Sequence, residues 1–410
     1  MTHFIIEHQC PQCGAPAELE ETDRLFRCGY CRVGSYLTVR DHFRYALPHR
    51  APNGRTLIYF PYWRFKGMLF SCLKNKIANR FVDVSHQAVP SMNFPVSVGF
   101  RSQTQKLHFA GARQEGVFIK PHVDSDRFLE DMAQRHSAGL PRPILHQAQI
   151  GETVSVLYAP FYRNGDLMDA ILNEPLAIGG KDDLEAILTR EEPPDWPLHF
   201  LPTLCPQCGW DLEGERDALV LNCDNCHTAW QARGTRLEQI KTAHESRKGD
   251  AAARYMPFWR ISADVSHIQL ETYADLVKAA NLPKAPRPEW HQVPFMFWSP
   301  AFKVRPQNLL TLANHVTLNQ PQVSLDAGQP RGRLQAVTMP LTEAVQTLKL
   351  LVAAFLRPRE RMAEVLPDLE IAARKALLVY LPFREGPHEY VHEGLNLAVH
   401  KGTLRHAANL

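Results

Sequence analysis

Two groups of four cysteines with the same internal spacing are the residues of this chain best suited to chemistry. In each group a CPQC segment is followed, after fourteen intervening residues, by a second CxxC pair. Two CxxC pairs at this separation are typical of a zinc site with four thiolate ligands. The predicted ligands are Cys10, Cys13, Cys28 and Cys31 in the first group and Cys205, Cys208, Cys223 and Cys226 in the second.

The spacing suits tetrahedral coordination, because a CxxC turn supplies two sulfurs and a hairpin returns the chain to supply two more. Gly14 and Gly209 follow the first pairs and permit the left-handed backbone that closes such a turn. A segment of this size buries too little core to fold alone, and a structural zinc ion supplies on the order of 10 kcal/mol. Since thiolates take all four positions, neither site has a place for water or substrate, and both should be structural.

These segments resemble the zinc-ribbon family, with knuckles of the rubredoxin CPxCG type. The resemblance covers about 35 residues in each copy and does not extend to the rest of the chain. It implies two structural Zn²⁺ ions as cofactors. Iron binds the same four sulfurs, so the ligands alone do not exclude it. A redox CxxC needs one pair at a helix N-terminus rather than two matched quartets.

The composition is that of an ordinary globular protein. The 410 residues suit two to four domains, with 45% hydrophobic and 22% charged residues. A formal net charge of +3 predicts no strong attraction to nucleic acid or to a membrane surface. The first quartet begins at residue 10, so no signal peptide is expected, and the longest apolar stretch, 350–356, is too short for a transmembrane segment. The cysteine usage predicts a reducing, cytoplasmic setting.

Several segments recur in the same order in the two halves of the chain. The segment 59–64 (YFPYWR) is echoed by 255–260 (YMPFWR), and 158–161 (YAPF) by 380–383 (YLPF). A weaker pair is 99–101 and 301–303. The offset between partners rises steadily, from 195 residues at the first cysteine to 222 at the last proline. Collinear copies with insertions produce such a trend, so we expect an internal duplication.

The predicted fold class is α+β, with two tandem copies of a small four-cysteine zinc ribbon followed by a strand-rich mixed domain. The expected parts are ribbon 1 (1–40), α+β domain 1 (41–190), a linker with ribbon 2 (191–235), and α+β domain 2 (236–410), a repeat of domain 1. Strands are predicted from β-branched and aromatic runs, and helices from apolar spacing. The strands are 56–60, 80–84, 154–158 and 377–380, with a turn at 164–165, and the helices are 124–136, 342–356 and a segment after 361.

The recurring Tyr-x-Pro-aromatic motif has two interpretations. Proline is usual at a strand entry or sheet edge, with the aromatic residues filling the core. Alternatively, the aromatics form platforms that stack bases or hold a peptide. The motifs start at Tyr59, Tyr158, Tyr255 and Tyr380, and the flanking cations are Arg64, Arg163, Arg260 and Arg384.

The segment 388–392 matches HExxH, the zinc-protease signature, through His388, Glu389 and His392. That chemistry needs both histidines on one helix face and a third ligand downstream. Here the segment follows Gly386-Pro387 and is expected in a hairpin, with His400 and His406 as the remaining conceivable ligands. A catalytic zinc site is therefore the least favoured interpretation.

The charge of the cysteine segments bears on the function. Residues 10–40 carry a net charge of zero, and residues 205–236 carry −2, so neither attracts phosphate strongly. We expect a non-enzymatic adaptor or assembly factor that binds a protein partner through two structural zinc ribbons. A nucleic-acid-binding protein is the alternative, and a zinc-dependent hydrolase that uses 388–392 is a distant third.

Overall fold

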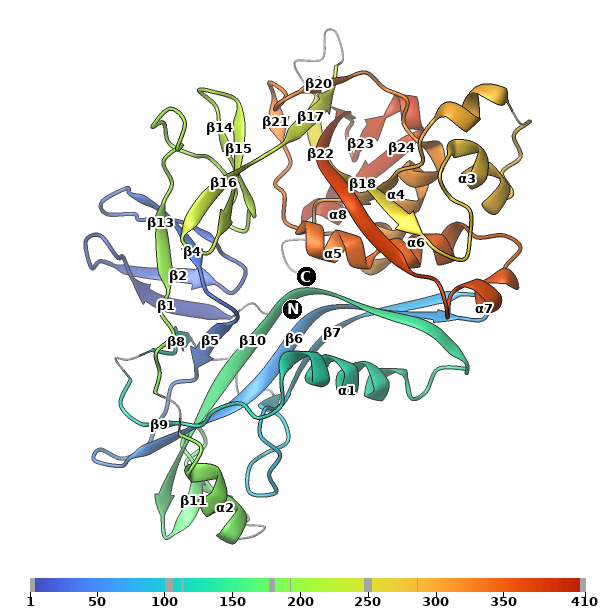
Figure 1. Ribbon diagram of the computed structural model, residues 1–410. Coiled ribbons are helices and arrows are strands. Elements are labelled where there is room, and N and C mark those ends of the chain that lie inside the picture. Colours follow the sequence, from blue (N-terminus) through green and yellow to red (C-terminus); the bar gives the residue numbers. More distant parts are fainter. Residues whose placement is uncertain are drawn as a thin grey trace.

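The computed structural model describes residues 4–99, 106–111, 114–176, 181–191, 193–246, 253–285 and 287–405. The chain forms two large sheets flanked by helices and two small sheets beside the cysteines (Figure 1). The mixed α and β architecture expected from the sequence is confirmed. Within these ranges, no helix is both long enough and apolar enough to cross a lipid bilayer.

The first large sheet has the order β12-β11-β10-β5-β8-β1-β2, with β6 beside β10 and both β7 and β9 beside β6. Its strands are β1 (Ile5–Gln9), β2 (Pro16–Glu20), β5 (Phe43–Ala46), β6 (Leu57–Leu73), β7 (Ile77–Gln87), β8 (Leu107–Phe109), β9 (Val117–Phe118), β10 (Ile144–Asn164), β11 (Asp166–Asp169) and β12 (Glu174–Pro175). The helices of this half are α1 (Ser125–Ser137) and α2 (Lys181–Leu188).

The second large sheet has the order β19-β18-β22-β17-β20, with β21 beside β18 and the hairpin of β23 and β24 beside β22. Its strands are β17 (Thr242–Glu245), β18 (Arg254–Val265), β19 (Phe297–Pro300), β20 (Leu325–Ala327), β21 (Arg333–Leu334), β22 (Ile371–Glu385), β23 (Glu389–His392) and β24 (Leu397–His400). Its helices are α3 (Tyr273–Ala279), η2 (Pro288–Gln292), α4 (Pro306–Asn319), α5 (Leu341–Gln346), α6 (Leu348–Phe355), α7 (Arg361–Val365), η3 (Glu393–Leu395) and α8 (Lys401–Arg405).

The two small sheets lie beside the cysteine quartets in the chain. One joins β3 (Leu25–Arg27), β4 (Gly34–Thr38) and β13 (His199–Pro202), in the order β13-β4-β3. The other joins β14 (Val220–Cys223), β15 (Thr228–Arg233) and β16 (Arg236–Ile240). Strand β13 comes from the far side of the linker, so a strand that leads into the second quartet completes the sheet of the first.

The two large sheets share one pairing scheme. Strand β10 is antiparallel to β6, with Tyr158 opposite Pro61, and β22 is antiparallel to β18, with Tyr380 opposite Pro257. The short strands β5 and β17 run parallel to β10 and β22, and the short strands β9 and β21 run parallel to β6 and β18. The two halves therefore place equivalent strands around the same central pair.

Tryptophan anchors extend this equivalence to the helices. The indole of Trp63 donates to the carbonyl of Val123 at 2.6 Å, and that of Trp259 donates to the carbonyl of Met339 at 3.0 Å. Each acceptor lies two residues before a helix, α1 in the first half and α5 in the second. Helix α1 thus corresponds in position to α5 followed by α6.

The weaker sequence match predicts that residues 99–101 and 301–303 occupy equivalent positions, and the described residues do not support this. Residues 100 and 101 lie outside the described residues. The backbone N–H of Ala88 donates to the carbonyl of Pro61, as that of Ala301 does to Pro257, both at 3.0 Å. Ala88 therefore takes the place of Ala301 in the first half.

The prediction that the motif prolines mark strand entries or sheet edges is wrong, because they lie inside the central strands. Pro61 falls between the stretch of β6 that pairs with β9 and the stretch that pairs with β7. Pro160 falls between the parts of β10 that pair with β5 and β11. Pro257 and Pro382 have the same position on β18 and β22. At each proline, the strand that pairs on the outer side of the central strand ends and another begins. Since no outer strand pairs with the proline itself, its missing N–H costs no hydrogen bond of the sheet.

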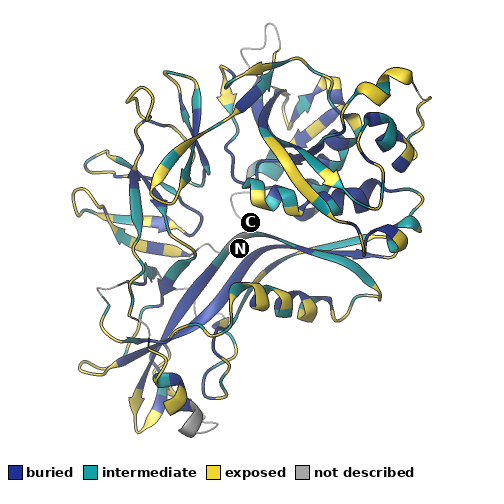
Figure 2. Ribbon diagram, viewed as in Figure 1, coloured by how far each residue is buried: buried dark blue, intermediate teal, exposed yellow. Residues whose placement is uncertain are grey.

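The aromatic residues of these motifs are core residues rather than exposed platforms. Tyr59, Tyr158, Tyr255 and Tyr380 are all buried, as are the aromatics that follow the prolines (Figure 2). Because their rings pack inside the sheets, they are not accessible for stacking with bases or a peptide. The core interpretation of the motif is confirmed.

The predicted strands fall within β6, β7, β10 and β22, and the helix predicted at 124–136 is confirmed as α1. The helix predicted at 342–356 is interrupted at Thr347, whose hydroxyl donates to the carbonyl of Ala344 at 2.6 Å. After Arg361 the helix is short, and the chain becomes strand β22 from Ile371.

The long strands of the first sheet join the two halves. The distal ends of β6, β7 and β10 run beneath α4, α5 and α6 of the second half, while α1 covers the opposite face of the sheet (Figure 1). The apolar residues of these ends belong to the core of the second half: Met68, Phe70, Cys72, Ala148 and Ile150. Cys72, the cysteine outside the two quartets, is completely buried in this core.

A buried ion pair ties the loop after β2 to β6. The Arg64 side chain, 3% exposed, contacts the carboxylate of Glu21, which is fully buried, and binds Asp83 through two hydrogen bonds of 2.9 and 3.0 Å. The Arg64 guanidinium also lies over the Phe4 ring, 4.0 Å from its centroid. These contacts hold the first cysteine segment on the large sheet.

The substitution Arg64→Ala should lower the free energy of unfolding by about 3–5 kcal/mol, because it leaves the Glu21 carboxylate buried without its cation. Urea denaturation followed by tryptophan fluorescence measures the loss. Arg374→Ala is the matched control: its pair with Asp264 is exposed, and its loss should cost less than about 1 kcal/mol. Equal losses in the two variants would contradict a structural role for the buried pair.

Candidate metal centres

Each cysteine quartet is gathered into a cluster of ligand size. The four sulfurs of each quartet lie within 4.8 Å of one another. In the first, Cys10 and Cys31 are 3.8 Å apart and Cys13 and Cys28 are 3.7 Å apart. The matching distances in the second are 3.6 and 3.4 Å. Tetrahedral zinc–sulfur bonds of about 2.3 Å place sulfurs about 3.8 Å apart, so both clusters fit a metal ion of this kind.

The first CxxC turn of each quartet is closed by the same hydrogen bonds. In the first quartet the N–H of Cys10 donates to Ala15 at 2.8 Å, and that of Gly14 donates to Cys10 at 2.9 Å. The equivalent bonds of Cys205 and Gly209 are 2.7 and 2.8 Å long. Both glycines have φ of +74°, which confirms their predicted left-handed role.

The second turns contain left-handed residues that the sequence did not reveal. Arg32 has φ of 61° and His227 has φ of 55°, although neither is glycine. Their N–H groups donate to Cys28 and Cys223 at 3.0 and 2.9 Å. Such a backbone is unfavourable for ordinary residues and persists where the surroundings impose it. Coordination of the adjacent cysteines to one ion would impose it.

The environment of the sulfurs favours cation binding. The backbone N–H groups of Cys31 and Tyr30 lower the pKa of the Cys28 thiol to about 6. Burial, followed by the neighbouring sulfurs, raises the pKa of the Cys223 thiol to about 12. Four thiols this close do not all ionise unaided, because their negative charges repel. A divalent cation removes this obstacle, and the donor set therefore fits zinc or iron.

The segments that carry the two quartets, residues 10–40 and 205–236, are called the cysteine units. They pack against each other, and strand β13, which leads into the second unit, pairs with β4 of the first. Asp23 pairs with Arg216, whose carbonyl accepts the N–H groups of Arg24 and Leu25 at 2.7 and 2.8 Å. The hydroxyl of Tyr36 donates to Ala218 at 3.1 Å. Their common apolar core contains Tyr36, Leu201, Cys205, Leu212, Leu221, Cys223 and Trp230. The units thus form one body, which the sequence did not indicate.

The HExxH segment does not form a helix. Residues 389–392 are strand β23, and His388 is exposed in the turn before it. His392 is buried: its Nε2 lies 2.8 Å from a Glu245 oxygen, and its Nδ1 accepts the N–H of Leu395. His406 lies outside the described residues. Over the ranges that the structure covers, the only groups of three or more potential ligands close enough to share an ion are the two quartets.

His392 has a structural counterpart in the first half. Asp169 ends β11 as His392 ends β23, and it accepts the N–H groups of the residues two and three positions later. Both hairpins then pass through a left-handed asparagine, Asn173 or Asn396. His392 therefore holds a turn, which accounts for its burial in the hairpin without metal chemistry.

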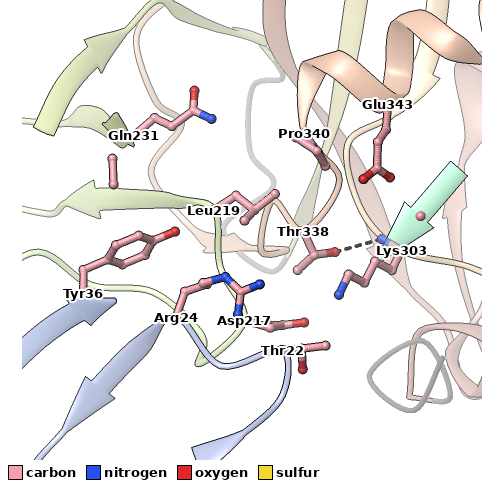
Figure 3. A pocket seen from close by; sticks show the side chains of 12 residues that line it. Thr22, Arg24, Tyr36, Asp217, Leu219, Gln231, Lys303, Thr338, Pro340 and Glu343 are labelled. Atoms are coloured by element: carbon pink, nitrogen blue, oxygen red, sulfur yellow. Dashed lines mark hydrogen bonds between the residues drawn. The ribbon is translucent and has the colours of Figure 1, made fainter. Parts of the chain in front are cut away.

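A cavity of about 160 Å³ lies where the two cysteine units meet strand β10 and the loops and helix α5 of the second half (Figure 3). Arg24, Asp217, Lys303 and Glu343 line it together with Thr22 and Tyr36. The backbone N–H of Lys303 donates to the Thr338 hydroxyl at 2.8 Å. Because two cations and two carboxylates share this small space, it offers no single charge that would select a ligand.

Comparison with known proteins found no matching family model, no similar curated protein and no similar solved structure.

The substitution Cys13→Ser should reduce the bound metal from two ions per chain to one, since a hydroxyl is a poor substitute for a thiolate. Elemental analysis of the purified chain measures the ratio and identifies the metal. Cys208→Ser should have the same effect at the second cluster. Cys72→Ala is the control and should keep both ions, because Cys72 lies in the core away from the quartets. A Cys13→Ser chain that retains two ions would disprove the first site.

Proposed function

We propose that the protein is a non-enzymatic adaptor or assembly factor, in which two structural zinc sites hold a surface that binds a partner protein. Each quartet belongs to a zinc ribbon, as its knuckle hydrogen bonds and sulfur spacing support. Zinc is favoured over iron because a closed site of four thiolate ligands is its usual structural site. A reducing compartment, such as the cytoplasm, suits cysteines that act as ligands.

The proposal includes an internal duplication, with each ribbon followed by a strand-rich mixed domain. Two sheets with the same pairing scheme, the two tryptophan anchors and the matched quartets occur in the same order along the chain. Independent origins would have to reproduce all of these features in sequence. The second copy then differs mainly by the helices inserted between β18 and β20.

Exposed apolar side chains at the cysteine units carry the functional proposal. Tyr30 is 72% exposed, Trp210 60%, Leu204 51% and Val33 42%. All four lie within two residues of a cysteine in sequence. Large apolar residues in water are unfavourable unless a partner covers them, and tyrosine and tryptophan contribute strongly to protein interfaces.

Two of these residues, Val33 and Leu204, come from different units and lie close in sequence to the paired strands β4 and β13. The pairing of Ser35 with Pro202 extends toward Val33 and Leu204, where Gly34 lies against the Thr203 side chain. A Cβ on Gly34 would lie 2.3 Å from the Thr203 hydroxyl oxygen, so only glycine permits this approach. The docked units together therefore present a surface that neither provides alone. Metal coordination would keep it rigid, which lowers the entropy cost of binding.

The charges near this surface do not favour nucleic acid, the alternative function. Arg216 pairs with Asp23, Arg27 lies 3.8 Å from Glu213, and Arg24 stacks over Phe43. These cations are engaged within the protein rather than arranged as a phosphate-binding row. A protein partner thus remains the better proposal.

Affinity capture from the native cell, with and without nuclease, tests the function. We expect a specific protein partner that survives nuclease and is lost with the double substitution Tyr30→Ser and Trp210→Ser. Leu172→Ser, which changes an exposed apolar residue on the distant hairpin, is the control and should retain the partner.

Three results would contradict the proposal in different ways. Partners recovered only with intact nucleic acid would favour the alternative. A partner that also binds the double variant would exclude this surface. Loss of a hydrolytic activity on Glu389→Gln would revive the enzyme hypothesis.

A further inference from the structure

An apolar groove lies between α1 and the edge strand β7 of the first half. Its volume is about 450 Å³. Phe128 and Met132 of α1 form one wall, and Val84 and His86 of β7 form the other. Val96, 60% exposed, lies at the rim. The size and lining are those of a binding site rather than of a packing defect.

The strand register identifies the equivalent wall in the second half. Ser85 pairs with Arg64 and Trp298 pairs with Arg260, and the two arginines end the same repeated motif. Val84 and His86 therefore correspond to Phe297 and Ser299. Phe297 and Ser299 are completely buried, whereas Val84 and His86 are only half-buried.

Helix α4 covers that wall in the second half. It packs against both β19 and α6, with Leu309, Leu312 and Val316 among its buried residues. The hydroxyl of Thr317 accepts the N–H of Trp298 at 3.0 Å and donates to its carbonyl at 3.2 Å. Between β7 and β8, the part of the first half that the structure describes contains no α-helix.

Within the described residues, the first half therefore has the wall and the flanking helix, and it has the segment 96–98 rather than a helix along the edge of β7. The N–H of Gln87 donates to Val96 at 2.9 Å, and that of Val98 donates to the Ser85 hydroxyl at 3.1 Å. We propose that this groove docks an amphipathic helix of a partner protein against α1, much as α4 packs against α6 in the second half. The proposal specifies the partner segment for the adaptor function and rests on that function, but it concerns a surface separate from the cysteine units.

The charges of α1 determine how the docking helix differs from α4. The tryptophan anchors place Arg135 and His136 where α6 has the buried Leu351 and Val352. Arg135 is exposed and makes no ion pair within the described ranges, and the Asp131 carboxylate is 3.3 Å from Arg127. A helix with apolar residues facing Val84 and Met132 would pack against β7 and α1, and an acidic residue facing Arg135 would form an ion pair with α1.

Selection from a helical peptide library tests the proposal with a defined probe. The library displays residues 306–319, the α4 sequence, randomised at Leu309, Leu312, Ala313 and Val316, and is selected against the full-length zinc-loaded chain. We expect selected peptides to keep apolar residues at most of these positions and to gain an acidic residue. Fluorescence anisotropy of the best peptide then measures its affinity for each variant.

Val96→Lys and Arg135→Glu should each weaken peptide binding about tenfold or more, the first by placing a charge at the apolar rim and the second by repelling the acid. Both residues are exposed, so neither change should unfold the chain. Gln134→Lys, also exposed on α1, is the matched control and should bind as the unmodified chain does. Failure to select a binder, or binding unchanged in both groove variants, would overturn the proposal.

The two proposals can fail separately. The Tyr30→Ser and Trp210→Ser chain should still bind the selected peptide, because those residues do not line the groove. If cellular capture succeeds and the peptide test fails, only the groove assignment is lost. If the peptide binds through the groove while capture depends on nucleic acid, the groove stands and the adaptor function falls.

Discussion

The pairing of β13 with β4 is the contact on which the arrangement of this molecule depends. A four-cysteine segment has little core of its own, so it needs both a metal ion and a neighbour. Strand β13 leads into the second quartet and also completes the sheet of the first. The buried carboxylate of Asp23 and the arginine that neutralises it reinforce the joint, although burial raises the pKa of Asp23. Two small units are thereby combined into one body with a shared core.

The large sheets show how one framework supports two different halves. Both are built on a long antiparallel pair, β6 with β10 and β18 with β22, with shorter strands parallel to it on the outside. In both, a proline stands where one outer strand ends and the next begins. The first half lengthens its central strands until they lie beneath the helices of the second. The second half instead inserts helices between its strands. If the halves arose by the duplication we propose, their later divergence made the interface between them asymmetric.

That asymmetry explains where the two proposed binding surfaces lie. In the second half, α4 fills the space beside the edge strand, and the adjoining Phe297 and Ser299 are completely buried. In the described part of the first half, the chain after β7 lies along the edge of that strand, and a groove bordered by polar residues of α1 remains beside it. The cysteine units expose the aromatic side chains of Tyr30 and Trp210 next to their CxxC turns. Both surfaces belong to parts whose backbone is fixed by other contacts, which is favourable for recognition.

Much of this organisation follows from local sequence. The eight cysteine ligands, the turn glycines Gly14 and Gly209, helix α1 and the main strands are determined by residue type and short spacing, which dictate local backbone geometry. The left-handed Arg32 and His227, the position of Pro61 within a strand, the turn held by His392 and the groove beside α1 were decided by tertiary structure. The two left-handed residues depend on two CxxC pairs meeting at one place, and the other features depend on which distant segments pair and in what register. A register is set by contacts between residues far apart in the chain, which no local pattern specifies.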